Sequence, residues 1–292
     1  MGGPDLDLRK LRYFVAVAEE LNFGRAAQRL HIAQPVLSRQ IRSFEDELGV
    51  RLFTRDSRGT ELTQAGTQLL EDATFLLNES TAMQQRLLRL AAPITTVRVG
   101  VMPGLLATAA AKAFEAEDPS RRAAIIHVGW ADQVAIVHRG EADVVYAREP
   151  IDHHRLGTAA LLDEPRDVAL HRSDPLAERS SVRLAELASR RMLQDPATVP
   201  EWYAIASPEQ RRASARNTAR TVEEKLELVA GAKGFVILPR STSAFYRRPD
   251  VRVIPLEDVG PSRVTLIWDA AKSNPTRDDF VAAALACRDQ TI

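Results

Sequence analysis

Apolar residues recur at helical spacing through the first fifty positions of the chain, and turn signals divide them into short segments. The apolar face predicted for a helix over residues 8–20 consists of Leu8, Leu11, Phe14, Val15 and Ala18. Asn22 is a suitable N-cap for a second helix over 23–30. A third helix is predicted over 35–48, where Gly49 can end it. Two short helices joined by a tight turn predict a helix-turn-helix.

The pattern changes after Gly49. Residues 50–63 alternate between apolar and polar side chains and carry a turn at Ser57-Arg58-Gly59. This pattern predicts a two-stranded hairpin, which beside a helix-turn-helix forms a wing. The sequence therefore predicts an all-α winged helix-turn-helix over residues 6–63.

A long helix is predicted next, capped by Thr63 and extending over residues 64–91. At about 1.5 Å per residue, such a helix spans roughly 40 Å. Its apolar stripe consists of Leu69, Leu70, Ala73, Leu76, Leu77, Met83, Leu87 and Leu90. A stripe of this length indicates a coiled-coil-like seam with a second copy of the chain. Beside a small winged domain, so long a helix is expected to have no core of its own to lie on. Packing onto its own chain is the alternative.

Beyond a linker at 91–96, short apolar strands alternate with helices. Strands are predicted at 96–102, 123–129, 142–148, 166–172, 215–219, 234–239 and 264–270. Helices are predicted at 104–117, 131–140, 221–233 and 276–290. Strands that alternate with helices favour parallel α/β units. The predicted fold class is therefore α/β, with the winged helix-turn-helix and the long helix in front of it.

Composition excludes several classes of protein. The formal net charge is +0, although residues 23–58 hold seven arginines against four acidic residues. The single cysteine, Cys287, cannot form an internal disulfide. The six histidines show no metal-binding spacing, and no GxSxG, Walker or GxGxxG motif is present. We therefore expect no catalytic residues, no metal and no cofactor. Without an apolar signal region or membrane span, we expect a cytoplasmic protein with no membrane contact.

The third helix carries an unusual number of side chains that can recognise nucleic acid. An α-helix fits the DNA major groove, where arginine reads guanine, glutamine reads adenine, and serine can bond either base or phosphate. The predicted DNA-binding residues are Gln34, Pro35, Ser38, Arg39, Gln40 and Arg42 on this helix, with Arg51, Arg55 and Arg58 of the wing. Val36, Leu37, Ile41, Phe44 and Leu48 are expected to form its buried face. Periodicity alone equally allows a solvated polar face.

The same residues resemble a known family. The run from Leu11 to Arg55, with LTQAG at 62–66, resembles the N-terminal domain of the LysR-type transcriptional regulators. The family pattern FxxAAxxLxxxQPxLSxQI matches from Phe23 to Ile41, and ELGVRLFTR matches the wing. The remaining chain resembles the family's effector-binding region more loosely, through VRVGV, GEADVVYA and LVAGAKGFVILP.

This resemblance implies a periplasmic-binding-protein-like effector region over 97–292, built from two α/β subdomains. Subdomain I is expected over 97–165 plus 269–292, and subdomain II over 166–268. A ligand cleft is expected between them. The resemblance also implies double-stranded promoter DNA as a partner, a homodimer through the linker helix, and association into a homotetramer.

Three loops are expected at helix N-termini in the cleft, where positive helix ends favour anions. The expected effector-binding residues are Met102, Pro103, Gly104, Leu105, Trp130, Arg148 and Thr221. Arg148 matches a position where benzoate- and muconate-responsive relatives carry an arginine, and an arginine suits a carboxylate. A surface or interdomain salt bridge is the alternative for Arg148. Relatives often carry hydroxyl residues where this chain has Gly104 and Trp130, which removes two donors. Trp130 can stack on an aromatic ring or fill the cleft.

The function predicted from the sequence is that of a LysR-type regulator. It binds promoter DNA as an oligomer and responds to a small-molecule effector such as an aromatic or organic carboxylate. The alternatives are a ligand-independent regulator, or a solute-binding or enzymatic α/β protein with an accessory DNA-binding domain.

Overall fold

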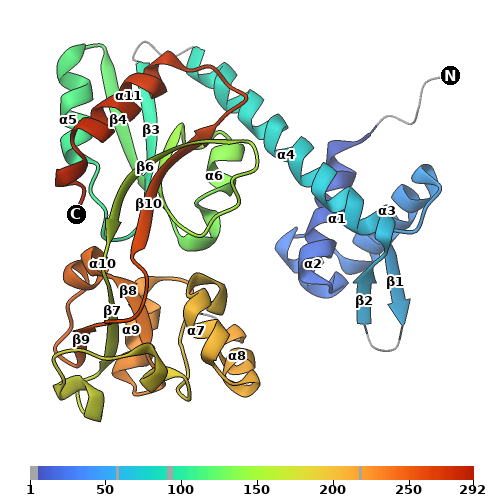
Figure 1. Ribbon diagram of the computed structural model, residues 1–292. Coiled ribbons are helices and arrows are strands. Elements are labelled where there is room, and N and C mark those ends of the chain that lie inside the picture. The colour runs from blue at the N-terminus through green and yellow to red at the C-terminus, as the bar shows by residue number, and fades with distance from the viewer. Residues whose placement is uncertain (1–5, 57–58, 91–94, 217–218) are drawn as a thin grey trace. The chain divides into compact units, whose positions relative to one another are not determined.

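The protein is described by a computed structural model covering residues 6–56, 59–90, 95–216 and 219–292. It divides into two compact units. The first comprises Met1–Leu90 with His138–Gly140, and the second comprises Ala91–Val137 with Glu141–Ile292. Figure 1 shows the elements of each unit. Among the described residues, no helix is long and apolar enough to cross a membrane.

Three helices form the core of the first unit: α1 (Leu8–Glu20), α2 (Phe23–Arg29) and α3 (Gln34–Leu48). The side chain of Asn22 accepts hydrogen bonds from the backbone N–H groups of Gly24 and Arg25 at 2.9 and 3.0 Å, as predicted for an N-cap. Gly49 ends α3 with a left-handed φ of 69°, a conformation in which glycine has no steric penalty. The predicted helix-turn-helix is thus present, with the predicted cap at Asn22 and the predicted terminal glycine at Gly49.

The predicted wing is an antiparallel pair, β1 (Phe53–Asp56) and β2 (Gly59–Leu62). Its first strand is tied to α3 by Glu45, whose side chain is buried. One carboxylate oxygen of Glu45 accepts from the backbone N–H groups of Leu52 and Phe53 at 2.8 and 3.2 Å. The other oxygen pairs with Arg51 at 3.0 Å. Glu45 therefore sets where the wing leaves α3.

Helix α4 (Gln64–Leu90) begins with the cap that the sequence predicts. Thr63 Oγ1 accepts from Gly66 N at 3.0 Å. A β-carbon at Gly66 would lie 2.2 Å from the carbonyl oxygen of Leu52. The start of α4 therefore passes so close to the wing that only glycine fits, which explains the last residue of the LTQAG motif.

The apolar stripe of α4 has two different environments. Leu69, Leu70, Ala73 and Leu77 pack against the core of the winged domain. Further apolar side chains on this helix are exposed, namely Phe75, Leu76, Met83 and Leu87. The expectation that α4 has no core of its own to lie on is therefore wrong for the first half of the helix. The side chain of Leu90 lies outside the described part of the chain.

In the second unit, a five-stranded sheet forms what we call lobe I. Its strands are β3 (Thr95–Val101), β4 (Arg121–His127), β5 (Val144–Arg148), β6 (Leu156–Glu164) and β10 (Ser262–Asp269), in the order β4-β3-β5-β10-β6. Alternate residues of β5 face opposite sides of the sheet. Val144 and Tyr146 pack in the core with α5 (Thr108–Glu117) and α11 (Pro275–Ala286). Val145 and Ala147 pack on the other side with α6 (Ala135–His138).

A smaller, antiparallel sheet forms lobe II, with β7 (Arg166–His171), β8 (Val236–Pro239) and β9 (Val251–Pro255) in the order β8-β7-β9. Its helices are α7 (Pro200–Ile205), α8 (Pro208–Ala215), α9 (Val222–Ala230) and α10 (Arg240–Phe245). Short 3₁₀ turns of lobe II lie at Pro175–Glu178, Leu184–Leu187 and Pro196–Thr198, and those of lobe I lie at Trp130–Asp132 and Arg288–Gln290. Apolar clusters cover both faces of this sheet, one containing Trp202 and the other containing Leu226.

Strand direction and strand membership of the two sheets differ from the sequence predictions. The parallel pattern holds only for β3 with β4 and β5, because β10 pairs antiparallel with β5 and β6. The return to lobe I was expected at 268–269, but β10 from Ser262 onward already belongs to the lobe I sheet. The sequence of an apolar strand does not show which sheet the strand joins.

The strand expected at 215–219 is not found among the described residues of that range. Ala215 is the last residue of α8, and residues 217–218 lie outside the described part of the chain.

Replacing Glu45 by alanine should destabilise the winged domain by about 2–4 kcal/mol, because two buried backbone N–H groups lose their acceptor. Hydrogen exchange of the full chain should show faster exchange at Leu52 and Phe53. The control is Glu47→Ala, which removes an exposed carboxylate of the same helix. Equal exchange in both variants would contradict this role for Glu45.

Candidate DNA-binding surface and effector cavity

The polar residues predicted to read DNA lie on the accessible side of α3. Gln34, Pro35, Arg39 and Arg42 are exposed, and Ser38 and Gln40 are half-buried. Leu37, Ile41 and Phe44 are buried on the opposite face, as predicted. Val36 was expected on that buried face but is 38% exposed. Helical spacing places Val36 on the same face as Arg39 and Gln40, three and four residues further on, where an apolar group can contact a thymine methyl.

The N-terminus of α3 has no side-chain cap, because Ala33 occupies the N-cap position. Pro35 lies in the first turn, where its missing N–H costs no intrahelical hydrogen bond. Uncapped backbone N–H groups at a helix N-terminus suit phosphate. The start of α3 is therefore compatible with a DNA backbone contact near Gln34.

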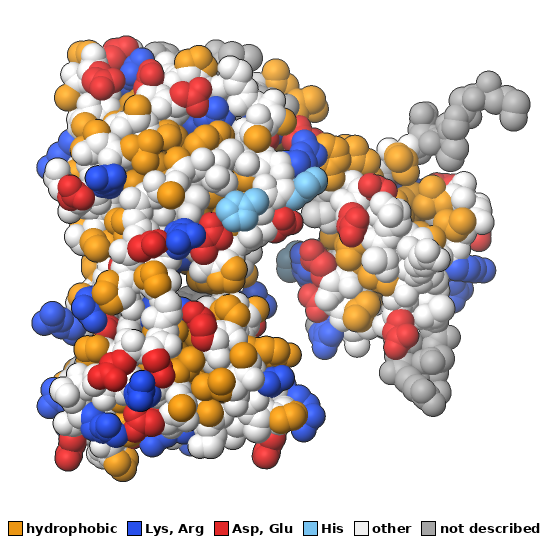
Figure 2. Space-filling model, in the orientation of Figure 1, with side chains coloured by type: hydrophobic (Ala, Val, Ile, Leu, Met, Phe, Trp, Pro, Cys, Tyr) orange, Lys and Arg blue, Asp and Glu red, His pale blue; other side chains and the backbone are white. Residues whose placement is uncertain are grey.

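The arginines predicted for the wing differ in what the structure describes. The side chain of Arg51 is 69% exposed while it pairs with Glu45, so it is both anchored and accessible. Arg55 lies in β1, but its side chain is outside the described part, as is all of Arg58. Over the described residues in Figure 2, acidic and basic side chains are interspersed, consistent with the net charge of +0.

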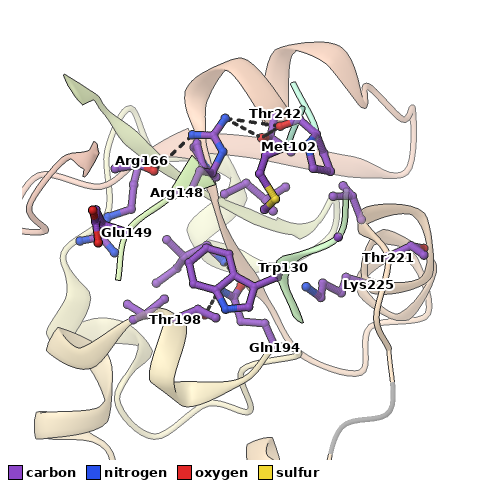
Figure 3. A pocket seen from close by; sticks show the side chains of 18 of the residues that line it. Met102, Trp130, Arg148, Glu149, Arg166, Gln194, Thr198, Thr221, Lys225 and Thr242 are labelled. Carbon is purple, nitrogen blue, oxygen red and sulfur yellow. Dashed lines mark hydrogen bonds between the residues drawn. The ribbon is translucent and has the colours of Figure 1, made fainter. Parts of the chain in front are cut away.

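A cavity of about 890 Å³ lies between lobe I and lobe II. This volume is in the range of small-molecule sites. Of the predicted effector residues, Met102, Pro103, Trp130, Arg148 and Thr221 line it (Figure 3). Gly104 and Leu105 are not among its lining residues, and Leu105 is buried in the lobe I core. The cavity therefore brings together residues from both lobes that are far apart in the sequence.

Arg148 is 3% exposed, and its guanidinium is engaged with protein groups of both lobes. Its Nη1 forms an ion pair with Glu164 and donates to Ser262 Oγ at 3.2 Å. Its Nη2 donates to Ser241 Oγ at 2.9 Å (Figure 3 shows this side of the cavity). Burial lowers the pKa of Arg148, and the charge of Glu164 opposes that effect. Arg148 thus lies in the cavity wall with both terminal nitrogens bonded to protein groups, while its buried Nε has no hydrogen-bond partner among the described residues.

Glu164 extends this contact into lobe II. It is 1% exposed, and its Oε2 accepts from the backbone N–H of Ser241 at 2.7 Å. Its Oε1 accepts from Ser241 Oγ at 3.0 Å. The first crossing between the lobes, at the end of β6, is therefore tied to the start of α10.

A second contact between the lobes involves the loop at 102–105. Thr242 Oγ1 donates to the carbonyl oxygen of Pro103 at 2.8 Å. Gly104 has a φ of +83°, and a β-carbon there would lie 2.6 Å from the backbone of Thr242. A hydroxyl-bearing residue at 104 would therefore be strained and would collide with lobe II. This explains why the chain has glycine where relatives were expected to have a donor.

The three expected helix N-termini differ from the prediction. Helix α5 begins at Thr108, beyond the loop at 102–105, and α6 spans only Ala135–His138. The capping box at Thr221 is confirmed, since Thr221 Oγ1 and Glu224 N are 3.2 Å apart and Glu224 accepts in return from Thr221 N at 3.2 Å. Backbone hydrogen bonds from Arg220 and Thr221 lower the pKa of Glu224. A protein carboxylate therefore already occupies this helix end.

Comparison with known proteins gives the family. Residues 8–67 match the family described as "Bacterial regulatory helix-turn-helix protein, lysR family", and residues 82–286 match the "LysR substrate binding domain". The chain belongs to the LysR family of transcriptional regulators. As a LysR-type regulator it is a DNA-binding protein with an effector-binding domain, and its family is one of regulators rather than enzymes.

Several relatives are similar to this LysR-type regulator over nearly their whole length. It is 30% identical over 289 residues to the Hca operon transcriptional activator HcaR of Escherichia coli, with 95% of this chain and 96% of the relative covered. It is 31% identical over 278 residues to the regulator BenM of Acinetobacter baylyi, with 92% and 90% covered. The structure of full-length BenM aligns with a TM-score of 0.54 at 28% identity, covering 98% of this chain and 97% of that one.

Several residues that line the cavity of this LysR-type regulator were not predicted from the sequence. Gln194 accepts from Ile237 N at 2.8 Å and donates to Thr198 Oγ1 at 2.8 Å. Tyr246 and Lys225 also line the cavity. Lys225 could have been found, because it follows Thr221 by four residues and thus shares its helix face. Gln194 lies in a segment without periodic pattern, so no comparable signal marks it.

Replacing Arg148 by methionine should lower the free energy of unfolding of the two-lobed unit by about 3–5 kcal/mol, because Glu164 is left as a buried, unpaired charge. The three tryptophans, Trp130, Trp202 and Trp268, all lie in this unit. Urea unfolding followed by tryptophan fluorescence therefore reports on it directly.

The matched control is the double variant Arg148→Met with Glu164→Gln. It removes both charges while leaving an acceptor for Ser241 N, so it should recover most of the loss. Equal unfolding midpoints for the single variant and the wild type would show that the ion pair does not hold the lobes together.

Proposed function

We propose that this LysR-type regulator binds promoter DNA as a homodimer, or as a tetramer of two dimers, and responds to a small organic anion bound between its lobes. The observation that carries the proposal is the cavity of about 890 Å³ with walls from both lobes, in a chain that also holds an accessible recognition helix. Because bacterial promoter DNA lies in the cytoplasm, the protein would act there.

The cavity walls support an organic ligand with an apolar body. Met102, Val128, Trp130, Ile237 and Tyr246 contribute apolar surface. Polar and charged side chains are interspersed among them, which is typical of sites that fix the orientation of a ligand. An aromatic or aliphatic carboxylate fits this composition.

The response to such a ligand would follow from differential binding. A ligand that contacts both lobes has unequal affinity for open and closed arrangements, and only this inequality can shift the population between them. The shift would alter how the paired winged domains are presented to DNA. Ligand binding in the cavity would then affect DNA binding by α3, although the two sites are separate.

Two alternatives predict different behaviour. A ligand-independent regulator would bind DNA identically with and without small molecules. A solute-binding or enzymatic protein with an accessory DNA-binding domain would not require its recognition helix for function. The cavity argues against the first alternative and the exposed polar face of α3 against the second.

Arg42→Ala should weaken binding to the DNA that flanks this gene by about tenfold or more, since a lost base or phosphate contact costs about 1–3 kcal/mol. Gel shifts at several salt concentrations measure this effect, and loss of a phosphate contact would also lower the salt slope by about one. Arg247→Ala, which removes an exposed arginine in lobe II, serves as the matched control. If Arg42→Ala and Arg247→Ala bound equally well, α3 would not be the reading helix.

Leu76→Glu combined with Met83→Glu should convert the oligomer to a smaller species. These side chains are 38% and 51% exposed on α4, and two charges in an apolar seam lack compensating partners. Sedimentation velocity measures the change. Gln68→Glu with Gln84→Glu adds the same charge at polar positions of the helix and should leave the oligomer intact. An unchanged double variant would place the main contact between copies outside α4.

A further inference from the structure

The basic residues that line the cavity differ in whether protein groups already neutralise them. Arg148 pairs with Glu164, Arg166 with Glu201, and Arg263 with Asp163. Each of these three guanidiniums has a carboxylate within ion-pair distance. A ligand anion at any of them would have to compete with a carboxylate held by the same chain.

Among the described residues, Arg220 and Lys225 are the lysine and arginine side chains of the cavity wall without an ion pair, but Arg220 is exposed to solvent whereas Lys225 is not. Lys225 lies on α9, lines the cavity and is half-buried. Within the described residues, its ammonium group has no hydrogen bond and no ion pair. Asp195 and Glu224 are near enough to raise its pKa, but burial has the larger effect and lowers it. An incompletely compensated ammonium in a partly buried place gains from an added anion.

The surroundings of Lys225 are suited to the rest of such a ligand. Figure 3 shows its side chain and the Trp130 ring reaching into the same cavity. Trp130 is half-buried, so part of its ring is available to a ligand. An indole face offers a stacking surface for an aromatic ring. Gln133 fixes the loop that carries Trp130, because its side chain bonds both the N–H and the carbonyl of Arg148, at 2.9 and 3.1 Å.

We propose that Lys225 is the anion anchor of the effector cavity, holding the negative group of an aromatic anion whose ring packs against Trp130. This inference rests on the proposed function of the cavity as the effector site. Arg148 then acts as a positioning residue, which keeps lobe I and lobe II at the spacing the ligand needs. The specificity for an anion comes from lobe II, and the surface for its ring comes from lobe I.

A matched pair of fluorescent probes can test the anchor without knowledge of the natural effector. 1-Anilinonaphthalene-8-sulfonate is an aromatic anion, and N-phenyl-1-naphthylamine has the same ring system without the charge. Both are titrated into the full-length protein. The wild-type chain should bind the anion more tightly than the neutral compound.

Lys225→Met keeps the length and apolar stem of the side chain but removes its charge. It should weaken binding of the sulfonate by about tenfold or more, since a charge-assisted contact is worth about 1.5–3 kcal/mol, and leave the neutral probe nearly unchanged. Lys225→Arg should retain most of the affinity. Lys233→Met removes an exposed lysine of lobe II outside the cavity wall and should bind both probes as the wild type does.

The outcomes separate this inference from the proposed function. If the wild type binds both probes and Lys225→Met loses neither, Lys225 is not the anchor, although the cavity can still be the effector site. If Lys233→Met loses the sulfonate as strongly as Lys225→Met, general charge attraction replaces the anchor. If the wild type binds neither probe, the cavity is not a site for aromatic ligands and both proposals fail.

Discussion

The ion pair between Arg148 and Glu164 is the contact on which the two-lobed unit depends. Both side chains are almost fully buried, so each charge would be costly without the other. Arg148 ends β5 in lobe I, and Glu164 ends β6 at the crossing into lobe II. Ser241, at the start of α10, bonds to both partners. One buried pair therefore joins both sheets and the first crossing between them, and it forms part of the cavity wall.

Glu45 has a comparable role in the winged domain. It too is a buried carboxylate that accepts from backbone N–H groups and pairs with an arginine. In each unit, a glutamate satisfies backbone donors where one element passes to the next. Buried carboxylates of this kind specify geometry, since their hydrogen bonds have narrow distance and angle requirements. Helix α3 and the cavity are thus each positioned in part by a buried carboxylate that pairs with an arginine.

The sequence was most informative where apolar periodicity and caps determine the structure. The caps at Asn22, Thr63 and Thr221 and the glycine that ends α3 were all predicted from residue type and spacing. The half of α4 that packs on the winged domain was not, because a single stripe cannot show which surface covers each of its parts. The strand β10 was placed in the wrong lobe for a similar reason.

The cavity residues were harder to predict than the fold. Trp130, Arg148 and Thr221 do line the cavity, but the partners of Arg148 lie 16 and 93 positions away at Glu164 and Ser241. No local pattern links such positions, so the sequence could not decide between a ligand contact and an internal ion pair. Gly104 illustrates the same limit, because its close approach to Thr242 is visible only in three dimensions.

The central claim is that the Arg148–Glu164 pair fixes the spacing of the lobes and hence the cavity. It is tested most directly by the distance between spin labels in the two lobes, measured by double electron–electron resonance. Labels at the exposed positions Lys112 on α5 and Glu209 on α8, with Cys287 replaced by serine, report this spacing. We expect one narrow distance distribution for the otherwise wild-type chain and a broader or shifted one for Arg148→Met, which removes the ion pair. Identical distributions for the two proteins would contradict this claim.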